Sequence, residues 1–379
     1  MTAALPARDL LEEFGSGDAR ARDESWRYSK PALRALAQQE FIAADTQATL
    51  PAELRERFEW IHTQGRRAVF VNGGFSTAYS NLAALGDAIA IRHEQPNRCV
   101  LTISADLAEP LHLVYLNMPS PSPSRWQASS EVQSQAGKAH LIEHHLGAAG
   151  ADVLGALTST TKVSAHAELQ ITTLCDLPDS VSLYRRTQAT AENDATLRTT
   201  HALLGGRLQR HDLNMELAGT QARYESCGVF VLRGRQHVDT HLDVRHVARD
   251  TACDIVWRGV ADQRARGVFH GAITVAEGAD GADAKLSNKN LLLSAQAEID
   301  TQPVLEIHAD EVKAAHGATV GQLDERVLFY MRSRGIPVGE ARRLLVAAFC
   351  DVALDRLPQA ALREHISALL APHLAGAGI

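Results

Sequence analysis

The sequence lacks several features that are typical of membrane, secreted and nucleic-acid-binding proteins. No run of about 18 apolar residues occurs, so we expect no transmembrane helix. The amino-terminal residues have no basic start followed by an apolar stretch, so we expect no secretory signal and a cytoplasmic protein. Aromatic residues are only 5% of the chain, the net charge is −7, and Lys and Arg form no stripe. A nucleic-acid-binding surface is therefore not expected.

Cysteine is scarce and scattered. The five cysteines are Cys99, Cys175, Cys227, Cys253 and Cys350, and no C-x-x-C occurs. In a reducing compartment such residues are buried free thiols. The sequence does not support a zinc or iron–sulfur site built from the thiolates of this chain alone.

Enzyme motifs are also missing. The sequence has no G-x-x-x-x-G-K-[ST], so the chain is not itself an ATPase. It has no G-x-S-x-G and no H-E-x-x-H. Glu298 and Asp300 share one face of an expected strand, as the two carboxylates of a carbohydrate-cleaving enzyme do. Those enzymes are typically secreted, and we expect no export here, so we expect a protein that is not an enzyme and has no catalytic residue.

The chain divides into three sections. Residues 1–66 are expected to be helical, with one short helix near residues 4–14 and another that starts at Pro51. Between them Trp26 to Tyr28 are expected to form a structural anchor. Residues 117–130 are rich in Pro and Ser and are expected to form an exposed loop.

Short alternating segments fill residues 136–307, where we expect no long helix. The run 69–76 contains Asn72–Gly73 and predicts a β-hairpin. No proline occurs between Pro178 and Pro303, which favours uninterrupted central strands. A sandwich, a barrel and a β-solenoid all fit this pattern, and the lack of a fixed-period repeat weakens the solenoid.

The last section is expected to be helical. Gly335 and Pro337 separate a first helix from one over Val338 to about Leu357, and Pro358 starts the last. The predicted packed face of the middle helix consists of Ala341, Leu344, Leu345, Ala348, Phe349 and Val352. The predicted packed face of the last helix consists of Leu362, Ile366, Leu369 and Leu370.

Histidines supply the candidate ligands. His316 follows an alternating run and precedes helical spacing, so it is expected where the sheet stops. The strand face made by His237, Asp239, His241, Asp243 and Arg245 has ligand-type residues at period two, but we interpret it as a solvated outer face. His140 and His144 share one face of an expected strand and His145 lies on the other, so they form no obvious three-ligand set and we interpret them as structural.

Five ordered segments resemble the SufB/SufD family of iron–sulfur cluster assembly scaffolds, and its SufD branch more closely. They are residues 24–31, 69–76, 206–219, 267–275 and 286–343. The resemblance implies a mainly β fold with a right-handed parallel β-helix core flanked by N- and C-terminal α-helical domains. It places the domains at 1–66, 67–322 and 323–379.

The resemblance also implies the partners and the site. A SufB-like subunit would pair near residues 300–321, and a SufC-like ABC-type ATPase would dock on the C-terminal helices. Candidates for the cluster or interface are His316, Lys313, Gly317 and Thr319, with His316 as the one metal ligand. Candidates for docking are Phe329, Arg332, Arg334, Gly335 and Arg342. No cofactor would be permanently bound, and a transient iron–sulfur cluster would form at the interface with the SufB-like subunit. When that partner is absent, the chain could form a homodimer instead.

Three points stay open from the sequence. Many family members have a cysteine two residues before the matching histidine, whereas this chain has Ala314, so His316 is either a ligand that depends on its partner or a structural residue. The chain could instead be the SufB-type subunit, although none of its cysteines lies within thirty residues of His316. It could also be a β-helix carbohydrate enzyme.

Overall fold

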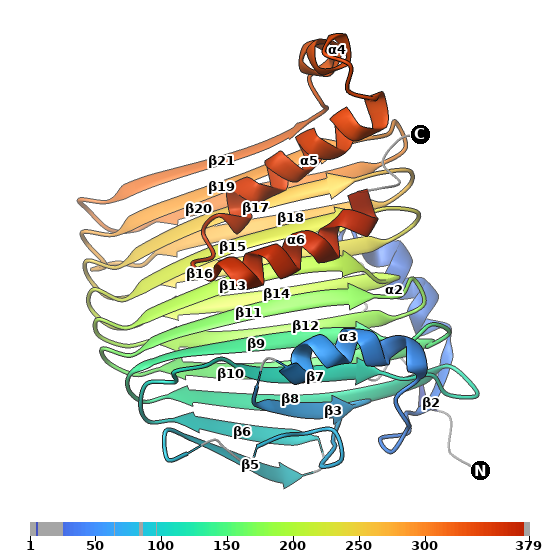
Figure 1. Ribbon diagram of the computed structural model, residues 1–379. Helices are drawn as coiled ribbons and strands as arrows, with labels where there is room; N and C mark the ends of the chain where they lie inside the picture. Colours follow the sequence, from blue (N-terminus) through green and yellow to red (C-terminus); the bar gives the residue numbers. More distant parts are fainter. Residues whose placement is uncertain (1–4, 7–25, 64, 83–85, 96, 375–379) are drawn as a thin grey trace.

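The protein is a parallel β-solenoid with helices on its outer surface (Figure 1). The computed structural model describes residues 5–6, 26–63, 65–82, 86–95 and 97–374. About eight turns stack along the solenoid axis, and each full turn gives one strand to each of two facing sheets. This confirms the expected mainly β fold with a parallel β-helix core.

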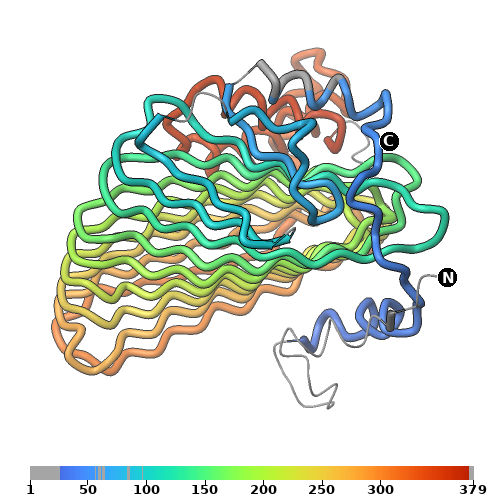
Figure 2. Tube along the Cα trace, turned by 90° about the horizontal axis from the view of Figure 1, so that it is seen from below, coloured from blue at the N-terminus to red at the C-terminus, as the bar shows by residue number. Residues whose placement is uncertain are grey.

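Two sheets form the walls. Within the described residues the first sheet contains β1 (Leu5–Pro6), β2 (Glu40–Ala43), β5 (Ile89–Gln95), β6 (Arg98–Ile103), β8 (Ser124–Ser134), β10 (Val153–Val163), β12 (Ser182–Ala191), β14 (Leu208–Leu217), β16 (His237–His246), β18 (Arg266–Val275) and β20 (Glu298–Ile307). The second contains β3 (Arg67–Val71), β4 (Gly74–Phe75), β7 (Leu111–Asn117), β9 (Lys138–Gly147), β11 (Glu168–Leu177), β13 (Thr196–Gly205), β15 (Arg223–Leu232), β17 (Ala252–Ala261), β19 (Asp283–Leu292) and β21 (Lys313–Gly321). Figure 2 shows the flattened coils from the end.

The coils differ in length, which explains why the sequence shows no fixed period. Ser182 pairs with Leu208 on the next turn, whereas Arg266 pairs with Glu298 across a longer stretch of chain. The strands of these coils keep the same length and the turns absorb the difference. Pro303 lies in β20, the last strand of its sheet, where a missing N–H donor is tolerated.

The expected hairpin is present and the expected loop is shorter than predicted. β3 and β4 pair antiparallel across Asn72 and Gly73, which have φ angles of 45° and 80° and so suit the turn. The Pro/Ser loop covers only residues 118–123, because β8 starts at Ser124 and alternates buried and half-buried residues through to Ser134. The prediction of a loop over 124–130 is wrong because small Ser and Ala side chains serve in a paired strand as well as in a loop.

The amino-terminal segment clamps the outside of the first sheet. Helix α2 (Lys30–Ala37) and β2 lie there, and the expected helix near residues 4–14 falls largely outside the described residues. Trp26 is the anchor that the sequence predicted. Its ring stacks on Tyr184 at a centroid distance of 5.8 Å, and the Arg210 guanidinium lies 4.2 Å from the ring.

Because the amino-terminal segment covers β16, the prediction of a solvated outer face for this histidine-rich strand is wrong in part. Val238, Leu242 and Val244 do face the core. On the other face, however, His237 and Asp239 are buried and not solvated, because Ser29 donates to Asp239 and lies 3.0 Å from His237 Nε2. Arg210 also pairs with Asp239 at 2.7 Å. The covering segment lies far from this strand in sequence, so a period-two pattern could not reveal it.

The second sheet is covered by helices from both ends of the chain (Figure 1). Helix α3 (Ala52–Thr63) packs at the amino-terminal end, and α5 (Val338–Leu354) and α6 (Ala360–Leu374) pack farther along. Arg57 of α3 and His373 of α6 both contact the Asp176 carboxylate on β11. One sheet residue therefore ties the two helical regions together. No helix among the described residues is both long and apolar enough to cross a membrane.

Candidate functional site

The last strand of the solenoid carries the predicted cluster or interface residues. Lys313, His316, Gly317 and Thr319 all belong to β21 and all are exposed. His316 is in the middle of this strand, since the sheet continues to Gly321 and the next helix begins at Glu325. The expectation that the sheet stops at His316 is therefore wrong, because the small residues after it continue the ladder.

β21 has an open hydrogen-bonding edge. It pairs with β19 on one side, and no other strand of the described residues pairs with it. A side chain at Gly317 or Gly321 would meet no atom within 4 Å, so the packing of this chain does not require glycine there. Ile307 and Val320 at the same end are each 42% exposed. An open edge with exposed apolar residues is a surface suited to pairing with another strand.

Among the described residues, His316 belongs to no cluster of potential metal ligands. All five cysteines are free and buried, as predicted, and burial raises the pKa of the Cys99, Cys175, Cys253 and Cys350 thiols to about 12. In the part of the chain that the structure describes, no group of three His, Cys, Asp or Glu residues could hold a metal ion. Ligands in addition to His316 would have to come from another molecule.

The helices next to this edge expose apolar side chains. Helix α4 (Glu325–Ser333) is capped at its amino-terminal end by Asp324, whose carboxylate accepts from the Arg326 N–H. Phe329 is 71% and Tyr330 is 58% exposed, and the Arg334 guanidinium lies 5.2 Å from the Tyr330 ring. Val327 on the same helix is also 40% exposed, so α4 presents apolar side chains to solvent.

The other predicted docking residues lie in the same region. Arg332 and Gly335 are exposed, and Gly335 has a φ of 87° in the turn after α4. Arg342 is on α5 and lines a cavity of about 160 Å³ between the helices and the turn after β19. Sequence reasoning missed Tyr330, although its position beside Phe329 was a usable signal.

The packed face predicted for α5 is only partly right, since Ala341 is buried and Phe349 packs against the buried cluster, but other members are exposed. Its buried residues are Ala341, Val346, Cys350, Ala353 and Leu354. Leu344 and Val352, predicted to be packed, are 43% and 50% exposed. The helix is apolar on two sides, so spacing alone could not decide which side lies on β15 and β17. The predicted face of α6 is confirmed for Leu362, Ile366 and Leu370.

Two other candidates turn out to be structural. Arg266 on β18 donates to both Glu298 and Asp300, at 3.0 and 3.1 Å, so one guanidinium bridges this carboxylate pair and offsets part of its charge. His112 Nδ1 lies 2.9 Å from His144 Nε2. Burial lowers the pKa of His144 well below its usual range, so its ring is neutral in the fold.

Comparison with known proteins gives one family. The model described as "SUF system FeS cluster assembly, SufBD core domain" matches residues 131–349. The SufBD family protein slr0076 of Synechocystis sp. is 28% identical over 396 residues, which cover 91% of this chain and 85% of that protein. The iron–sulfur cluster assembly protein SufD of Escherichia coli is 30% identical over 243 residues, which cover 64% of this chain and 57% of SufD.

Proposed function

Since the chain belongs to the SufBD core family of the SUF iron–sulfur cluster assembly system, we propose that it is a non-catalytic scaffold subunit of that system. It pairs through β21 with a SufB-like subunit and docks a SufC-like ABC-type ATPase on α4 and α5. The main observation in support of this pairing is the open edge of β21. A partner strand there would continue the sheet by backbone hydrogen bonds, and a second copy of this chain would occupy the edge when the partner is absent.

The cluster is cargo that forms transiently at this interface. A histidine ring nitrogen is a competent iron ligand, and the His316 side chain is exposed beside the open edge. The thiols of this chain are buried away from it, so the partner supplies the thiolates. The buried thiols also favour this role over the SufB-type role, which needs a reactive cysteine.

The His316→Ala variant tests the cluster role. In a complex co-expressed with SufB-like and SufC-like chains, we expect iron and sulfide content to fall about tenfold, the scale of losing one group that supports a metal site. Anaerobic absorbance and iron and sulfide assays on the complex, isolated by size exclusion, give the measurement. His308→Ala is the matched control, since His308 is also exposed, in the turn between β20 and β21. Unchanged loading in an intact complex would make His316 structural.

The Phe329→Ala variant tests the docking surface. An exposed aromatic residue that becomes buried in a partner pocket typically contributes about 2 kcal/mol, or about 30-fold in affinity. Titration calorimetry with the ATPase subunit should show this loss for Phe329→Ala and none for Val247→Ala. Val247 is 37% exposed but lies in the turn after β16 and belongs to neither α4 nor α5. Equal affinities for the two variants would remove α4 from the docking surface.

A further inference from the structure

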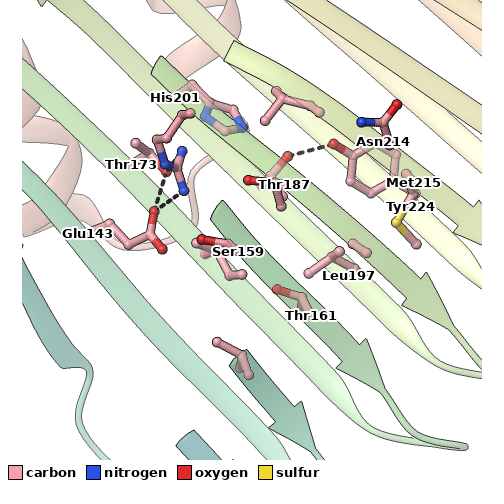
Figure 3. A pocket seen from close by; sticks show the side chains of 16 residues that line it. Glu143, Ser159, Thr161, Thr173, Thr187, Leu197, His201, Asn214, Met215 and Tyr224 are labelled. Carbon is pink, nitrogen blue, oxygen red and sulfur yellow. Dashed lines mark hydrogen bonds and ion pairs between the residues drawn. The ribbon is translucent and has the colours of Figure 1, made fainter. Parts of the chain in front are cut away.

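One layer of the solenoid interior is polar, although most of the interior is apolar. Glu143, Thr173 and His201 occupy matching positions on the neighbouring strands β9, β11 and β13. They line one pocket between the sheets (Figure 3). Arg185 reaches them from β12 in the opposite sheet and donates to the Glu143 carboxylate and, at 3.2 Å, to the Thr173 hydroxyl.

A small cavity remains beside this ion pair. Its volume is about 30 Å³, and a site for one water needs about 10–15 Å³. Room for two waters is therefore present. Arg185 and His201, which line the cavity, are only 2% and 3% exposed.

Several polar atoms around the cavity have no partner within the described residues. They are Arg185 Nε, Thr187 Oγ1 and both ring nitrogens of His201. A buried polar atom without a hydrogen bond costs free energy, and native proteins fill such sites with ordered molecules. The unpaired atoms therefore point to an occupant.

The hydrogen-bonding capacity of these atoms selects the kind of occupant. Burial, and then the nearby Arg185 charge, lower the pKa of His201 to about 3, so its ring is neutral at pH 7 and needs one donor and one acceptor. Arg185 Nε only donates. An anion cannot donate to His201 and a metal ion cannot accept from Arg185. Arg185 and Glu143 also cancel in charge, so nothing offsets the desolvation of an ion.

We propose that this cavity is a binding site for neutral, water-sized molecules that both donate and accept hydrogen bonds, with a pair of waters as its resting occupant. The occupant bridges Arg185 Nε, His201 and Thr187 Oγ1. The polar layer is then a closed hydrogen-bond network inside the solenoid. The site does not depend on the proposed scaffold role.

Diffraction from crystals of the full chain grown in sodium bromide distinguishes the possible occupants. We expect two solvent peaks within about 2.7–3.2 Å of the unpaired atoms and no anomalous bromine signal in the cavity. A bromine peak there would show that the site takes an anion, and an empty cavity would show that it takes nothing. Either result overturns the proposal.

A measurement in solution checks the same site. Oxygen-17 relaxation dispersion of water counts internal waters with long residence times. We expect Thr187→Ile, which fills the cavity, to lose two such waters relative to the wild-type chain, and Thr187→Val to weaken their retention. Thr190→Ile is the matched control, since Thr190 lines an open groove on the outer face of the same strand, and should change nothing. An unchanged count in a folded Thr187→Ile variant would contradict the proposal.

Discussion

The Arg185→Leu variant should be destabilised by about 3–5 kcal/mol in free energy of unfolding, the cost of leaving one charge of a buried pair without its partner. The side chains of Arg185 and Glu143 are only 3% and 4% exposed. Removing the guanidinium leaves the Glu143 carboxylate with one donor, the Thr173 hydroxyl at 3.2 Å. Urea titrations of the wild-type and variant chains, followed by circular dichroism, measure the loss.

The double variant Arg185→Leu with Glu143→Leu shows whether the charge causes the loss. With both charges gone, apolar side chains fill the layer, and we expect stability to return to within about 1–2 kcal/mol of the wild type. Lys162→Ala is the control, because its ion pair with Glu192 lies at the surface, with side chains 57% and 38% exposed. Exposed pairs contribute about 0–1 kcal/mol. If the double variant were as unstable as Arg185→Leu alone, the loss of stability would come from altered packing and not from the unpaired charge.

The polar layer of Arg185 and Glu143 could not be predicted from the sequence. The alternation of side chains along a strand predicts which residues point inward, and it places Val238, Leu242 and Val244 correctly. Glu143 and Arg185 were not predicted to pair, because the two residues lie on opposite sheets, 42 positions apart. Because the coils vary in length, spacing does not show which residues of successive turns meet, and the pairing emerges only in three dimensions.

The candidate site was predictable in position but not in geometry. Resemblance located His316 and Phe329, and both are exposed at the carboxyl end of the solenoid. The helix face of α5 and the clamp over Asp239 depend on long-range packing that local spacing does not contain. Leu344 and Val346 are both apolar, and only contact with β15 and β17 makes the second the buried one.

Acid should unfold the chain cooperatively between about pH 6 and pH 5. Burial lowers the pKa of His112, His140, His237 and His246 to about 4 and that of His201 to about 3. An unfolded histidine has a pKa near 6.5, so below that value the unfolded chain binds more protons than the folded one. At pH 5 each of these histidines lowers the free energy of unfolding by about 2 kcal/mol. The five together approach the whole free energy of unfolding of a typical domain.

The buried Asp239 carboxylate does not contribute in this range. Burial raises its pKa, but the charge of Arg210 and the interactions with His241 and Ser29 outweigh burial and hold this pKa below its usual range. Its contribution is therefore lost only as the pH falls below about 4. The pH dependence of urea unfolding between pH 7 and pH 5 therefore measures the contribution of the buried histidines. His201→Gln should reduce proton uptake on unfolding near pH 5.5 by about one. Stability that stayed level from pH 7 down to pH 5 would contradict the prediction, because it would mean that the buried histidines bind protons as readily in the fold as in the unfolded chain.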